Sequence, residues 1–139
     1  MTQEEKALLL KDLCGRLPYG VKVKLGDNPN IFDLKYRIKF AVMYGDSDKL
    51  EDILDITNIK PYIFPLSSMT DKQREELYKI GWYLDEDKIY SCFRNYDDAN
   101  YKTHIDSFEL INWCYKNNFD INGLIPMGLA IDATGLNIY

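Results

Sequence analysis

The stretch KPYIFPLSSMTDKQREEL, residues 60–77, carries the strongest local signals of the sequence, because two prolines precede an evident helix start. Proline disfavours helical geometry in the residue before it, so the backbone on either side of Tyr62 is pushed toward an extended form. We therefore predict extended structure over residues 60–66. We place this segment away from the centre of a sheet, because Pro61 and Pro65 have no N–H to donate to a neighbouring strand.

The second half of the same stretch predicts a helix. Thr70 and Gln73 have the spacing of a capping box, in which each side chain satisfies a backbone group that the first helical turn leaves free. The helix should continue to about Ile80 and end before Gly81. Its expected inward contacts are Met69, Leu77 and Ile80.

Upstream, the chain should begin with another helix. Thr2 and Glu5 form a T-x-x-E capping box, and Pro18 marks the end of the helix. Apolar residues recur at i, i+3, i+4 and i+7, which predicts one buried face. The residues of this predicted face are Leu10, Leu13, Cys14 and Leu17.

Between this helix and the proline-containing stretch, the pattern favours strands. Apolar and polar residues alternate over 20–25 and again over 35–44, which is typical of strands with one buried face. The turn-forming residues between them predict an antiparallel hairpin. Residues 50–56 are read either as a third strand or as a short helix, and their β-branched content favours the strand.

Downstream, residues 88–93 are expected to form a strand, and the polar stretch 94–103 a loop. A third helix should start near Asp106, and residues 123–131 should form a short helix or an irregular segment on the core. The apolar stripe of the third helix is predicted to consist of Phe108, Ile111 and Tyr115, widened by Leu110, Trp113 and Cys114.

These elements predict one α+β domain over residues 1–139, with about three helices packed on a small antiparallel sheet. The sheet could be open or curl toward a half-barrel. The length suits a single modest core, and 46% hydrophobic with 28% charged residues is typical of a globular chain. No apolar run reaches the ~18–20 residues of a membrane helix, so no membrane association is expected.

Composition also bears on compartment and chemistry. The N-terminus carries acidic residues before a short apolar run, which is unlike a secretory signal, and the three cysteines are odd in number and widely spaced. We therefore predict an acidic cytoplasmic protein with reduced thiols. The single histidine, His104, excludes metal motifs that need two histidines, and glycine-rich phosphate loops are absent. No catalytic residue, metal or cofactor is predicted.

Two groups of residues are candidates for partner binding. If 20–25 and 35–44 pair, five cations share one face of the sheet and could hold nucleic-acid phosphates, although the aromatic residues would lie on the opposite face. These cations are Lys22, Lys24, Lys35, Arg37 and Lys39. The alternative is a solvated sheet face. Tyr62 and Phe64, from a chain with eleven tyrosines, are candidate contacts with another protein, or else buried structural side chains.

Three blocks of the sequence are similar to a widespread set of small uncharacterised proteins from gut Bacteroidetes and from their phages and mobile elements. The blocks are LLLKDLCGRLPYGVKV, IKPYIFPLSSMT and FDINGLIPMGLAIDA. The resemblance implies a bacterial or phage-infected cytoplasm and an accessory role, but no activity. The leading hypothesis is therefore a small non-catalytic interaction protein. Nucleic-acid association through the basic hairpin is the second hypothesis, and a small enzyme that uses His104 with an acid or thiol is the third.

Overall fold

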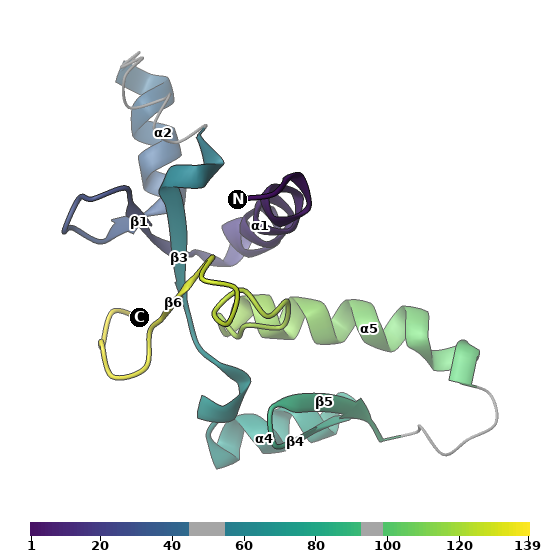
Figure 1. Ribbon diagram of the computed structural model, residues 1–139. Helices are drawn as coiled ribbons and strands as arrows, with labels where there is room; N and C mark the ends of the chain where they lie inside the picture. Colours follow the sequence, from purple (N-terminus) through teal and green to yellow (C-terminus); the bar gives the residue numbers. More distant parts are fainter. Residues whose placement is uncertain (45–54, 93–98) are drawn as a thin grey trace.

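A computed structural model describes residues 1–44, 55–92 and 99–139, with the backbone alone placed for 40–42, 44 and 99–107. It confirms the α+β class. Its main sheet has the strand order β2-β1-β3-β6, and β4 and β5 form a separate antiparallel pair (Figure 1). The main sheet is mixed rather than purely antiparallel, because β3 and β6 run parallel. In the described part of the chain the sheet stays open and closes into no barrel.

Helix α1 (Gln3–Arg16) begins at the predicted capping box. The Glu5 amide donates to the Thr2 hydroxyl at 3.1 Å, and the Thr2 amide donates to the Glu5 carboxylate at 2.7 Å. The predicted face is wrong, however, because Leu10 and Cys14 are exposed. The helix instead buries Leu9, Asp12, Leu13 and Arg16. Half of this face is an ion pair, which a search for apolar residues does not detect.

Strand β1 (Lys22–Leu25) confirms the first predicted strand, and its apolar side faces the core. The second predicted strand is wrong, since residues 34–44 form helix α2 (Leu34–Tyr44). Strand β1 pairs with the short strand β2 (Phe32–Asp33) on one side and with β3 (Ile59–Ile63) on the other. The Asp33 carboxylate accepts from the amide of Lys35 at 3.1 Å, and this cap starts the helix directly after β2.

The predicted third strand, 50–56, falls mostly outside the described residues, and Ile56 begins a 3₁₀ turn, η2 (Ile56–Asn58). The proline-containing stretch is extended as predicted, but β3 is central in the sheet and not peripheral. Both prolines are tolerated for a structural reason. Pro61 is paired with β1 but lies before the two-residue pairing with β6 (Ile131–Asp132), and Pro65 follows the strand.

The second half of the chain follows the prediction more closely. Helix α4 (Asp71–Lys79) starts at the Thr70 capping box, and the hairpin of β4 (Trp82–Asp85) and β5 (Lys88–Ser91) follows it. Helix α5 (Ala99–Lys116) begins well before Asp106, so 99–103 are helical and not a loop. Its buried side includes Leu110 and Cys114. Residues 123–130 are irregular, as one of the two readings expected.

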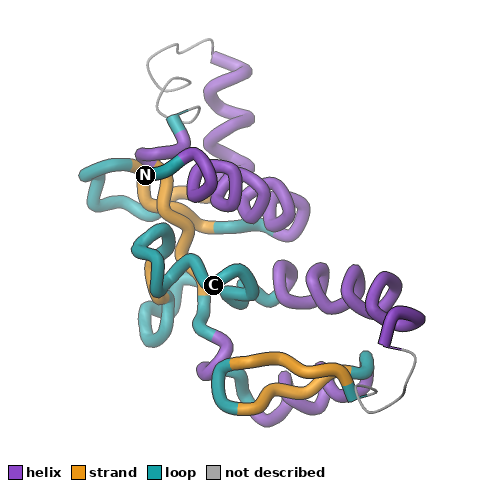
Figure 2. Tube along the Cα trace, turned by 45° about the vertical axis from the view of Figure 1, so that its right-hand side comes forward, coloured by secondary structure: helices purple, strands orange, loops and turns teal. Residues whose placement is uncertain are grey.

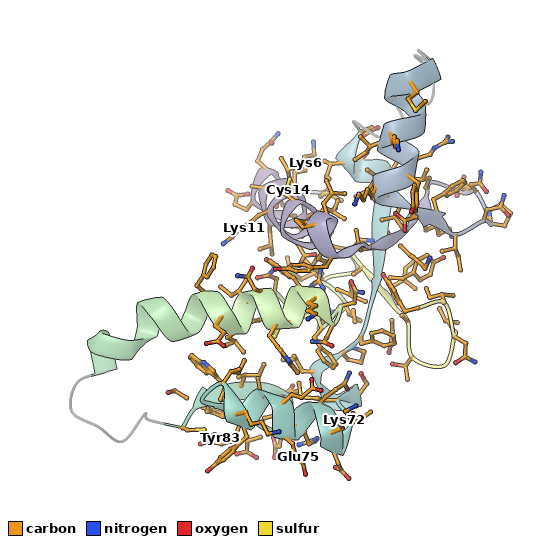
Figure 3. All side chains as sticks on the ribbon, turned by 180° about the vertical axis from the view of Figure 1, so that it is seen from behind. Lys6, Lys11, Cys14, Lys72, Glu75 and Tyr83 are labelled. Atoms are coloured by element: carbon orange, nitrogen blue, oxygen red, sulfur yellow. The ribbon has the colours of Figure 1, made fainter. Side chains whose placement is uncertain are left out.

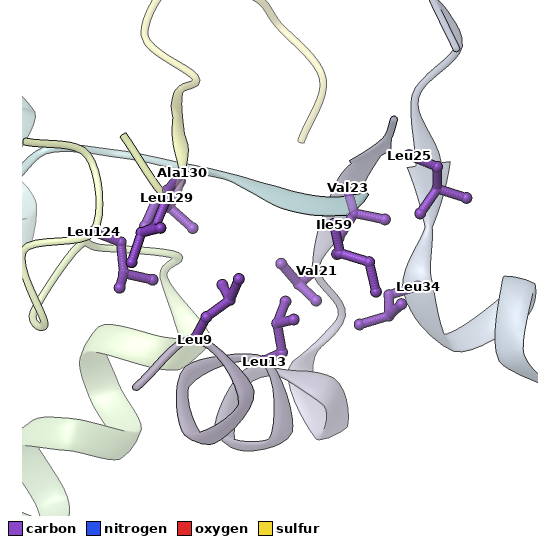
Figure 4. Close-up of a cluster of buried hydrophobic side chains, with 11 residues drawn as sticks. Leu9, Leu13, Val21, Val23, Leu25, Leu34, Ile59, Leu124, Leu129 and Ala130 are labelled. Atoms are coloured by element: carbon purple, nitrogen blue, oxygen red, sulfur yellow. The ribbon is translucent and has the colours of Figure 1, made fainter. Parts of the chain in front are cut away.

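Two clusters of buried side chains hold these elements. The first lies between α1 and the main sheet (Figure 4) and consists of Leu9, Leu13, Val21, Val23, Leu25, Leu34, Ile59, Ile63, Leu124, Leu129 and Ala130. The second joins α5 to α4 and the β4–β5 hairpin and consists of Met69, Leu77, Trp82, Leu110, Cys114 and Phe119. Helix α5 has α1 on one side and the β4–β5 hairpin with α4 on the other (Figures 1 and 2).

Candidate functional site

A polar cavity of about 240 Å³ lies where β1 ends, beside the first turns of α2. Its lining comes from three elements: the end of β1 with the turn that follows it, helix α2, and the turn η2. The lining residues are Leu25, Gly26, Asp27, Asn28, Arg37 and Asn58. Only one of these residues has an apolar side chain, and two have side chains of opposite charge. The cavity is therefore suited to a small polar molecule rather than an apolar one.

Backbone hydrogen bonds fix the shape of this cavity. Gly26, with a φ of +51°, donates its N–H to the carbonyl of Asn58 at 2.7 Å, which joins the turn to η2. The amide of Asn28 donates to the carbonyl of Leu25 at 3.0 Å, and the Asn28 side chain accepts from the amide of Asn30 at 3.0 Å. The positive φ favours glycine at position 26. The turn is thus held by its own contacts and does not need a ligand to form.

Arg37 is the cation of this cavity. It lies on the same face of α2 as Leu34 and Ile38, which pack against the first core cluster, so its stem runs along the apolar side of the helix. Its guanidinium lies over the ring of Phe32, 5.2 Å from the centroid. The Nε atom is buried without a hydrogen-bond partner, and no carboxylate in the described part of the chain forms an ion pair with Arg37. A buried N–H of a charged group without an acceptor is costly.

The basic hairpin face predicted from the sequence does not exist, because 35–44 is helical. Lys22 and Lys24 do lie on the outward side of β1, with Lys60 of β3 opposite Lys24. The other three predicted cations, Lys35, Arg37 and Lys39, belong to α2. The prediction of nucleic-acid association therefore loses the shared face on which it depended, and binding itself stays a prediction.

The two aromatic candidates of the proline-containing stretch are enclosed by the fold to different degrees. Tyr62 is 8% exposed and Phe64 is half-buried. The ring of Phe64 lies 5.8 Å from the ring of Tyr139, whose hydroxyl donates to the carbonyl of Tyr62 at 2.7 Å and accepts from the amide of Lys22 at 2.9 Å. Both rings thus have structural neighbours, and a role in partner binding stays a prediction.

A buried polar cluster that the sequence analysis missed joins α1 to the end of α5. The fully buried Arg16 donates from Nε to Asp12 at 2.5 Å and from Nη2 to the carbonyl of Phe119 at 2.7 Å. Asn122 donates to both Asp12 and the hydroxyl of Tyr115, at 2.9 and 3.1 Å. The i, i+4 spacing of an acid and an arginine on α1 is the only signal in the sequence. Because Asp12 and Arg16 are fully buried, we assign this cluster a structural role.

Helix α5 also has apolar residues that stay exposed in the described part of the chain. Phe108 is 71% exposed and Ile111 is 37% exposed, although both were predicted to face inward. Residues 108, 111 and 115 share one side of the helix, and residues 110 and 114 lie on the adjoining side, in the second core cluster. Tyr115 is covered by α1, so this face is buried at its C-terminal end and open one and two turns earlier.

All three cysteines are free thiols, and burial raises the pKa of Cys114 to about 12, with a small opposing effect from Arg16. Among the side chains that the structure places, no group of three or more His, Cys, Asp or Glu residues is arranged to hold a metal ion. The side chain of His104 lies outside the described part, so the hypothesis of a His104 enzyme stays untested.

Comparisons with protein-family models, with curated proteins and with solved structures found no match for this chain. Within the described residues, no helix is both long enough and apolar enough to cross a membrane.

Proposed function

We propose that this chain is a non-catalytic interaction protein that binds another protein through the open face of α5, formed by Phe108 and Ile111. The observation that carries this proposal is that the apolar arc of α5 is wider than the part that the fold buries. Leu110 and Cys114 lie in the second core cluster, whereas the adjoining side of the arc is covered only at Tyr115. A helix that is apolar around most of its circumference is typical of one that is enclosed on most sides.

The open face of α5 exposes a large apolar side chain. A phenylalanine that is 71% exposed on an otherwise ordered helix keeps most of its ring in water. Burying such a ring against a partner contributes about 1.5–3 kcal/mol, which is the size of a strong interface contact. Lys11 lies on the side of α1 that is nearest α5 (Figure 3), whereas the residue next to Phe108 is the exposed Glu109, so a partner with exposed apolar side chains fits this surface best.

The experiment compares a variant of the open face with a matched surface control. Phe108→Glu places a charge on the proposed contact, whereas Tyr78→Glu places the same charge on α4 at a site that is 67% exposed. Each immobilised variant is used to capture proteins from a gut Bacteroidetes lysate, the host that the sequence resemblance suggests. The captured protein is then purified and titrated against each variant by calorimetry, and circular dichroism verifies the fold.

We expect Phe108→Glu to weaken binding by at least tenfold, with Tyr78→Glu equal to the unmodified chain. Equal binding by all three proteins would place the contact elsewhere and overturn the proposal. A captured protein that turned over or modified a small molecule only together with this chain would instead favour an accessory subunit of an enzyme. An accessory role in a bacterium or its phage is part of the same proposal.

A further inference from the structure

The cavity beside α2 is separate from the open face of α5, because no residue of α5 lines it. Figure 1 shows α1 between these two helices. Its cation is not a freely solvated surface arginine. Arg37 is half-buried, its guanidinium lies over Phe32 at 5.2 Å, and its buried Nε has no acceptor among the described residues. A guanidinium over an aromatic ring makes a cation–π contact, and its planar fork still matches the geometry of a planar oxyanion.

The anionic group of the cavity is Asp27, on the turn after β1. Asp27 and Arg37 line the same cavity, yet they form no ion pair with each other in the described chain. Two residues of opposite charge that line one small cavity without forming an ion pair suit a ligand that carries both charges. Asn28 adds a polar side chain next to Asp27, and its oxygen is already occupied by the amide of Asn30.

We propose that this cavity binds a small zwitterion, whose carboxylate pairs with Arg37 and whose ammonium group pairs with Asp27. A guanidinium pairs with a carboxylate through two parallel hydrogen bonds, which gives the pair both strength and a fixed orientation. The cavity volume of about 240 Å³ is below the usual range for drug-sized ligands, about 300–1,000 Å³, and so limits the ligand to roughly the size of one free amino acid.

The test uses the full chain labelled with ¹⁵N and follows amide shifts in NMR titrations. The probes are glycine and alanine as zwitterions, acetate as a carboxylate without an ammonium group, inorganic phosphate as a second oxyanion, and methylammonium as a cation alone. We expect saturable shifts at Gly26 and Asn28 with a zwitterion, and at least tenfold weaker binding of acetate and methylammonium. Tighter binding of phosphate than of any zwitterion would overturn the assignment of the ligand class.

Variants then separate the two charges. Arg37→Lys keeps the charge but lacks the planar fork, so we expect it to lose at least tenfold in affinity for the zwitterion. Asp27→Asn should weaken zwitterion binding and leave acetate unchanged. Lys39→Met, which removes an exposed cation from the same helix, is the matched control and should bind as the unmodified chain does. The ¹⁵N spectrum of each variant verifies its fold.

The absence of saturable shifts in the unmodified chain at 50 mM of every zwitterion would overturn the proposal, as would equal affinity of Arg37→Lys and the unmodified chain. Equal losses of zwitterion affinity in Arg37→Lys and Lys39→Met would show that the affinity depends only on the net charge of the surface. That result would also overturn the proposal.

Discussion

Gly15 of α1 lies directly against the ring of Tyr115 of α5. A β-carbon at position 15 would overlap the ring edge at Cε2 and would lie 2.7 Å from Cδ2 and 3.0 Å from Cζ. On the same side, the guanidinium of Arg16 lies over the Tyr115 ring, 4.9 Å from its centroid. The two helices therefore meet where α1 has no side chain, and the buried Asp12–Arg16 pair lies beside this contact.

Gly15→Ala should destabilise the fold, although alanine favours helices. The overlap with a buried ring costs about 1–3 kcal/mol, whereas the gain in helix propensity is about 1 kcal/mol. Urea unfolding should give a lower free energy of unfolding for Gly15→Ala, while Cys14→Ala, at an exposed neighbour, changes it by less than about 0.5 kcal/mol. In a Tyr115→Leu background, the same glycine substitution should become neutral or stabilising, and an undiminished cost there would contradict the packing explanation.

Asp12→Ala should be among the most damaging substitutions in α1. It leaves the fully buried Arg16 without its carboxylate partner, and breaking a buried pair in this way costs about 3–5 kcal/mol. Replacing both residues, as in Asp12→Leu with Arg16→Met, should cost less than Asp12→Ala alone because no uncompensated charge remains. The free energy of unfolding by urea measures both, and a more costly double variant would show that the hydrogen bond of Arg16 to Phe119 dominates.

The hydroxyl of Tyr139 should make stability depend on alkaline pH. Burial, opposed by the hydrogen bond from Lys22, raises the pKa of Tyr139 to about 12, from an ordinary value of 10. A raised pKa in the folded state means that the contribution is complete below pH 10 and is lost as the pH rises toward 12. We expect Tyr139→Phe to lower stability by about 1 kcal/mol at pH 7. This difference from the unmodified chain should shrink between pH 10 and 12, and a constant difference would contradict the mechanism.

The cysteines should react in an order set by burial. Because burial raises the pKa of Cys114 to about 12, almost none of its thiol is ionised at pH 8, whereas Cys14 is exposed to reagent. Iodoacetamide followed by mass spectrometry should modify Cys14 in the folded chain and Cys114 only after denaturant is added. Cys14→Ala serves as the control, and rapid labelling of Cys114 in that folded variant would contradict its enclosure by the second core cluster.

The parts of the fold that the sequence predicts are those determined by local chemistry. Both capping boxes, at Thr2 and Thr70, form as expected because their hydrogen bonds span only three residues. The stretch 35–44 shows an alternating pattern and is nevertheless helical, since the Asp33 cap and the contacts of Leu34 with the first core cluster decide its structure. The alternation of apolar residues indicates neither the Asp33 cap nor the contacts of Leu34.

The buried face of α1 was predicted wrongly for a related reason. Asp12 and Arg16 are charged, and their burial depends on Phe119 and Asn122, more than a hundred residues away. The candidate cavity was not predicted from the sequence. Arg37 was among the five cations of a hairpin that does not form, and Asp27 lies among the turn-forming residues after the first strand. Long-range placement brings these two residues to one cavity.

The parallel pairing of β3 with β6 has a consequence for synthesis on the ribosome. Tyr62 is synthesised before its partner Ile131, so the edge of β3 stays uncovered until β6 is made, and at about 5–20 residues per second this delay is on the order of several seconds. During that time the nascent chain presents an apolar strand edge next to a half-finished sheet, which is a site for unwanted pairing between polysomal neighbours. A chaperone that shields residues 59–63 during translation would therefore raise the yield of native protein more than one that acts after release.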